Sequence, residues 1–82
     1  MDDKETVIRK GKQAALLQTD PILTECLERI KTKQVQNIVG SSPEKSDQRE
    51  RAYYLLKAVE ELQIELNSVV SNGRFEEARL RK

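Results

Sequence analysis

The sequence predicts an all-α protein, and three observations support this fold class. The composition is rich in charged residues (35%) and poor in aromatic residues (4%), which is typical of helices rather than sheets. Apolar residues recur at spacings of three and four, the period of one helix face. Two turn-forming segments, 19–21 and 40–46, separate the helical stretches. Because 82 residues leave room for one core, we expect residues 1–82 to form a single domain.

The first helix is expected over residues 5–18, where Val7, Ile8 and the segment 14–17 supply apolar positions. Gly11 lies in its middle. A glycine inside a helix costs about 1 kcal/mol relative to alanine. The helix is therefore expected to bend at Gly11 or to begin after it.

The second helix is expected over residues 21–39. Asp20 can accept hydrogen bonds from the free N–H groups of the first turn, and Pro21 suits the first helical position. Gln34 interrupts the apolar stripe of this helix. That stripe comprises Leu23, Leu27, Ile30 and Ile38, with Ile22 and Cys26 beside them.

The third helix is expected over residues 47–71, after a loop that begins at Gly40. Asp47 and Glu50 form a capping-box pattern at its start, and Asn72-Gly73 is typical of a helix end. A short basic helical tail, 74–82, would follow. The second and third helices should then form an antiparallel hairpin, with the first helix folded across its open side.

The third helix carries a heptad pattern, which is typical of helices that pair with other helices. A chain this small buries little surface, so a homo-oligomer is expected. The seam can face the other two helices or a second chain, and the pattern leaves both open. Tyr54 and Ile64 lie off the seam and are candidates for a partner surface. The seam consists of Ala52, Leu55, Val59, Leu62, Leu66 and Val69.

Catalytic and metal chemistry is not expected. The chain has no histidine, one cysteine and only isolated glycines, so the usual general base, metal ligands and phosphate loops are missing. Cys26 occupies an apolar helical position and is expected to pack in the core rather than react. Of the adjacent Tyr53 and Tyr54, one is expected in the core and one at the surface. We therefore expect no enzyme activity, no cofactor and no metal.

Basic residues gather at both ends of the chain, while the net charge is only +1. If the two ends meet, they could bind phosphate, although such runs are more often solvated surface. This favours, as an alternative function, a nucleic-acid-associated accessory factor, for example in DNA packaging. The candidate phosphate contacts are Arg9, Lys10, Lys12, Arg74, Arg79 and Arg81.

Four segments together resemble small proteins encoded by tailed bacteriophages and prophages, whose genes lie near those for virion assembly. The segments are 11–17 (GKQAALL), 20–21 (DP), 49–56 (RERAYYLL) and 68–74 (SVVSNGR). The resemblance implies a structural or assembly role, in the host cytoplasm or in the virion, with another phage protein as a further candidate partner. It supplies no functional residues.

The sequence also lacks an apolar run near the roughly 18 residues of a membrane span, and its acidic start is unlike a secretory signal. No membrane association is expected. The leading expectation is thus a non-enzymatic, self-associating, protein-binding module in virion assembly or its regulation.

Overall fold

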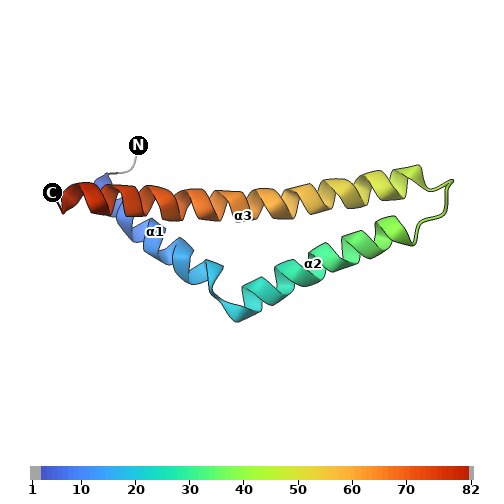
Figure 1. Ribbon diagram of the computed structural model, residues 1–82, viewed down its shortest axis with the longest axis horizontal. Helices are drawn as coiled ribbons and strands as arrows, with labels where there is room; N and C mark the ends of the chain where they lie inside the picture. The colour runs from blue at the N-terminus through green and yellow to red at the C-terminus, as the bar shows by residue number, and fades with distance from the viewer. Residues whose placement is uncertain (1–2, 82) are drawn as a thin grey trace. The chain divides into compact units, whose positions relative to one another are not determined.

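The computed structural model describes residues 3–81 and contains three α-helices, which confirms the all-α prediction (Figure 1). They are α1 (Lys4–Gln18), α2 (Pro21–Val39) and α3 (Ser46–Leu80). The contacts divide the chain into two compact units. Unit 1 combines α1 with the part of α3 from Gln63 onward, and unit 2 runs from Pro21 to Leu62. The single helix α3 thus contributes to both units.

Helix α1 begins where a side chain satisfies its first turn. Asp3 is the N-cap, and its Oδ1 accepts a hydrogen bond of 2.8 Å from the Thr6 backbone N–H. This bond lowers the pKa of Asp3, because it stabilises the carboxylate form. At the other end, the Thr19 hydroxyl donates to the carbonyl oxygen of Leu16. Both ends of α1 therefore have partners for exposed backbone groups.

Unit 1 is built on a close crossing of two glycines. A Cβ atom added at Gly11 would lie 2.8 Å from the Gly73 Cα and 3.2 Å from the Val69 carbonyl oxygen. A Cβ atom added at Gly73 would likewise lie 2.8 Å from the Gly11 Cα. Both glycines are buried, and the buried Ala14 and Val70 lie in the same unit. The absence of two side chains lets α1 and α3 approach closely at this crossing.

This crossing corrects two expectations about glycine. Helix α1 does not begin after Gly11 but runs from Lys4 to Gln18, and Gly11 is used for packing rather than as a helix breaker. Helix α3 does not end at residue 71, and Asn72-Gly73 is not a cap, since α3 continues to Leu80. The expected tail, 74–82, is the last part of α3 as far as Leu80. The propensity cost of two glycines inside helices is offset by helix–helix contact.

Unit 2 joins α2 to the first part of α3 through residues 40–45. The bounds of α2 match the predicted 21–39. Leu27 and Gln34 are its buried residues, and Ala52 and Val59 are buried on α3. Gln34, which breaks the apolar stripe in the sequence, is only 7% exposed, and its Oε1 accepts a hydrogen bond from the Asn37 amide. A buried amide with a partner avoids the cost of an unsatisfied polar group.

The connection between α2 and α3 is held by one guanidinium group. Arg49 Nη1 donates to the Ser42 carbonyl oxygen at 2.8 Å and to the Ser41 hydroxyl at 3.2 Å. Its Nη2 donates to the Pro43 carbonyl oxygen at 3.3 Å. Three acceptors from consecutive residues are thus bonded to a side chain in the first turn of α3.

Candidate functional site

The predicted heptad seam is divided between buried and exposed positions. Val59 is 9% exposed, and Leu66 and Val69 are half-buried. Leu55 and Leu62 are 42% and 46% exposed. Only part of the seam therefore packs within the chain, and two of its leucines remain accessible.

The reason is that α3 buries a neighbouring heptad line, which shares every second position with the predicted one. In unit 2 the less exposed positions include Ala52, Leu56 and Val59, and in unit 1 they include Gln63, Leu66, Val70 and Gly73, with Val69 beside them. This line also repeats at spacings of four and three, so the two patterns share Ala52, Val59 and Leu66. The two lines differ at the positions between these shared residues. Leu55 and Leu62 therefore lie beside the buried line rather than on it.

The candidate partner residues off the seam are both exposed, Tyr54 by 60% and Ile64 by 57%. The Tyr54 hydroxyl donates to Glu50 at 2.9 Å, and this bond to a carboxylate raises the pKa of Tyr54. Tyr53 is also exposed, by 51%, with the Lys57 ammonium 5.5 Å from its ring centroid. The expectation that one of the two tyrosines lies in the core is therefore wrong. Adjacent residues on a helix point about 100° apart, and neither tyrosine lies on the buried line.

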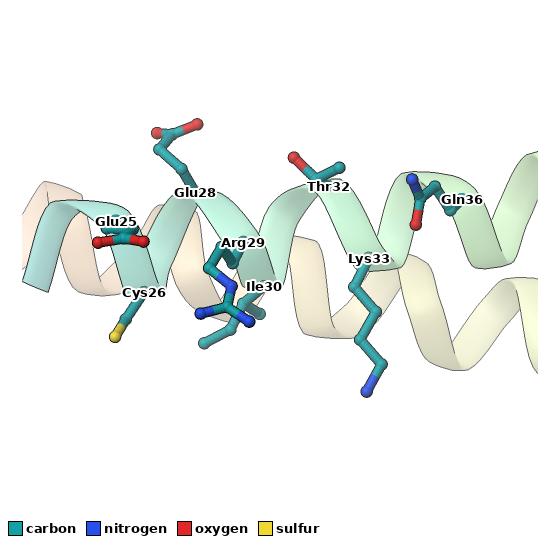
Figure 2. A pocket seen from close by; sticks show the side chains of 8 residues that line it. All are labelled: Glu25, Cys26, Glu28, Arg29, Ile30, Thr32, Lys33 and Gln36. Carbon is teal, nitrogen blue, oxygen red and sulfur yellow. The ribbon is translucent and has the colours of Figure 1, made fainter. Parts of the chain in front are cut away.

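Helix α2 carries an open groove whose lining residues all come from α2 itself (Figure 2). Cys26 and Lys33 extend from one side of the helix, and Glu28 and Thr32 from the opposite side. Cys26 is an exposed free cysteine, so its expected place in the core is wrong. The buried positions Leu27 and Gln34 are seven residues apart, and Cys26 lies one residue away from that line.

The basic residues from the two chain ends share unit 1, and most of their named contacts are with carboxylates. Lys12 Nζ lies 3.2 Å from Glu77 Oε2, and Arg81 Nη2 lies 3.1 Å from Glu77 Oε1. Arg79 Nη1 lies 3.4 Å from Glu76 Oε1. A phosphate group would compete with these carboxylates for the cations.

The remaining candidate phosphate contacts, Arg9, Lys10 and Arg74, also belong to unit 1. Arg74 and Lys12 line one small pocket at the glycine crossing. Arg9 lines a shallow depression on α1, and Lys10 is exposed. Lys12 thus shares a pocket with Arg74 and the Glu77 carboxylate with Arg81.

Comparison with known proteins adds no relative. No protein family, no curated protein and no solved structure matches the chain. The expected resemblance to tailed-phage proteins therefore finds no support in these comparisons. The chain is shown to be a small, all-helical protein.

Two further findings concern membranes and metals. Across residues 3–81, no helix combines the length and the apolar character that a membrane span requires. Within the same range, no three His, Cys, Asp or Glu side chains gather closely enough to hold a metal ion.

Many exposed apolar side chains indicate a binding surface, and some of them were not identified by sequence reasoning. On α2, Ile30 was expected on the apolar stripe and Ile22 beside it, whereas Val35 and Val39 were not assigned to it. The width of the apolar face of α2 could have indicated these exposed residues, because one neighbouring helix covers only part of a wide apolar face. The exposed α2 residues are Ile22 (68%), Ile30 (41%), Val35 (48%) and Val39 (79%).

Proposed function

We propose that this protein is a non-enzymatic, protein-binding module that self-associates through α3. The observation that carries the proposal is the exposure of Leu55 and Leu62 on a helix with a heptad pattern. Heptad leucines are stabilising when they insert between the side chains of a facing helix. A second chain can supply that helix.

The small core supports the same proposal. Among residues 3–81, two of the five buried hydrophobic residues are alanines, and no side chain is less than 2% exposed. Fully burying a leucine stabilises a protein by about 1.5–3 kcal/mol, so each half-exposed leucine leaves stabilisation to be gained by association. The buried hydrophobic residues are Ala14, Leu27, Ala52, Val59 and Val70.

We further propose that the module serves virion assembly or its regulation, in the host cytoplasm or in the particle. This setting rests on the resemblance of residues 11–74 to proteins of tailed phages. Within such a setting another phage protein would be the second kind of partner. Co-purification of the chain with structural proteins from infected cells, and its loss on deletion of that partner, would test the setting separately from self-association.

Light scattering coupled to size-exclusion chromatography tests self-association over a concentration series. The chain mass is 9.4 kDa, so one added subunit doubles the measured mass. We expect a defined oligomer that dissociates on dilution. Leu62→Asp should yield a folded monomer, because the side chain is 46% exposed in one chain. A monomer at every concentration of the wild type would refute self-association and favour a module that binds only foreign proteins.

The second candidate function is a nucleic-acid-associated accessory factor. It is favoured by the meeting of Lys12 and Arg74 at one pocket of unit 1. Phosphate contacts make affinity fall steeply with salt concentration. A mobility-shift assay at about 50 mM salt should then show a complex that is lost at about 200 mM, and no complex at the lower salt would exclude this function.

A further inference from the structure

One exposed line on α3 carries two leucines around a central alanine, with a charged residue at each end. Its residues are Arg51, Leu55, Ala58, Leu62 and Glu65, at spacings of four, three, four and three. At 3.6 residues per turn they fall within about 80° of one another around the helix. All five are exposed. We call them the 51–65 face.

The face is symmetric about Ala58 in size and opposite in charge. Leu55 and Leu62 lie three and four residues from Ala58, and Arg51 and Glu65 each lie seven residues from it. If a second helix runs antiparallel, Ala58 meets its own copy, and each Leu55 lies within one residue, about 1.5 Å, of the level of a Leu62. Each Arg51 meets a Glu65, twice per pair of chains. A parallel partner would instead place Arg51 against Arg51 and Glu65 against Glu65.

We propose that the occupant of the 51–65 face is a second copy of this chain, bound antiparallel with the two-fold axis at Ala58. This inference rests on the proposed self-association and specifies its partner, direction and register. A two-fold axis requires one patch that is complementary to itself, and this face meets the requirement in shape and charge. The small Ala58 side chain allows close helix approach at the axis, and the terminal ion pairs fix the register.

Charge reversal provides the first test. Arg51→Glu places two carboxylates opposite each other at both ends of the antiparallel pair, and Glu65→Arg places two cations there. Each variant should weaken dimerisation about tenfold, since two exposed ion pairs become repulsive. Combining both changes in one chain should restore the dimer, and mixing the two single variants should give a heterodimer. Unchanged affinity in both single variants would overturn the inference.

A cysteine at the axis provides the second test. In a Cys26→Ser background, Ala58→Cys should form a disulfide-linked dimer under mild oxidation, because only residues at the axis face themselves. Gln48→Cys is the control, since this exposed residue lies ten positions from the axis. The control should stay unlinked in an antiparallel pair. Equal cross-linking of both variants would indicate a parallel dimer and overturn the inference.

A matched pair of apolar substitutions separates this inference from the proposed function. Leu62 and Ile64 are 46% and 57% exposed on the same helix, and only Leu62 belongs to the 51–65 face. We expect Leu62→Asp to abolish the dimer and Ile64→Asp to leave it intact, with equal helicity by circular dichroism. A dimer that is sensitive only to Ile64→Asp would refute the 51–65 face and keep self-association. A wild-type monomer would refute both.

Discussion

Replacing Gly11 by alanine tests the central contact of unit 1, because two physical effects of the substitution have opposite signs. Alanine is favoured over glycine in a helix by about 1 kcal/mol. At this position, however, the added Cβ would lie 2.8 Å from the Gly73 Cα and 3.2 Å from the Val69 carbonyl oxygen. Both are backbone atoms and cannot rotate away, so α1 and α3 must separate.

The expected result is a net loss of stability. Overpacking of a well-packed contact costs about 1–3 kcal/mol, from which the propensity gain of about 1 kcal/mol is subtracted. We expect the free energy of unfolding to fall by up to about 2 kcal/mol, and Tm to fall by several degrees, about 4–8 °C per kcal/mol in a domain of this size. Urea and thermal unfolding followed by circular dichroism would measure both quantities.

The control is Asn72→Ala, a neighbouring exposed position in α3. It gains helix propensity without a new contact, so stability should stay constant or rise slightly. Gly73→Ala should behave like Gly11→Ala, since it meets the same crossing from the other helix. If Gly11→Ala raises stability by about 1 kcal/mol, the close crossing is refuted.

Two other substitutions test local contacts. Arg49→Ala removes three hydrogen bonds to the loop, so we expect a loss of about 1–2 kcal/mol in urea unfolding and faster thermolysin cleavage within 40–45; an unchanged midpoint would contradict the loop geometry. The pKa of Asp3 is lowered by the Thr6 N–H bond, so its stabilising effect is present above the unfolded pKa, near 4, and is lost as pH falls through the lower folded value. Asp3→Asn keeps an acceptor at the cap without this titration, and the wild type should therefore lose more helicity than the variant between about pH 4 and 2. Equal pH profiles would rule out the cap as the cause.

The sequence predicted most of the helix bounds correctly where a few neighbouring residues decide them. The Asp20-Pro21 restart and Gly40 gave the bounds of α2, which the structure matches. The start of α3 was expected at Asp47 and lies at Ser46. Helix caps and turns depend on a few residues that are neighbours in the chain, so they can be predicted from the sequence.

The candidate binding surface on α3 could be predicted from the sequence only in part. The heptad seam identified α3 as the helix with a packing pattern, and its shared positions Ala52 and Val59 are buried. The same pattern could not show that Leu55 and Leu62 are exposed. Two overlapping heptad lines on one helix satisfy the same spacing rule, and a neighbouring helix selects between them.

The sequence by itself thus determined the helical class, the bounds of α2 and the apolar faces, because each follows from local propensity and periodicity. Only the tertiary structure decided which of those faces is covered. It made Gly11 and Gly73 a packing contact instead of helix breakers, placed Gln34 in the interior and left Cys26 exposed. These outcomes depend on which residues distant in sequence come together, and a glycine that weakens a lone helix can stabilise a crossing of two.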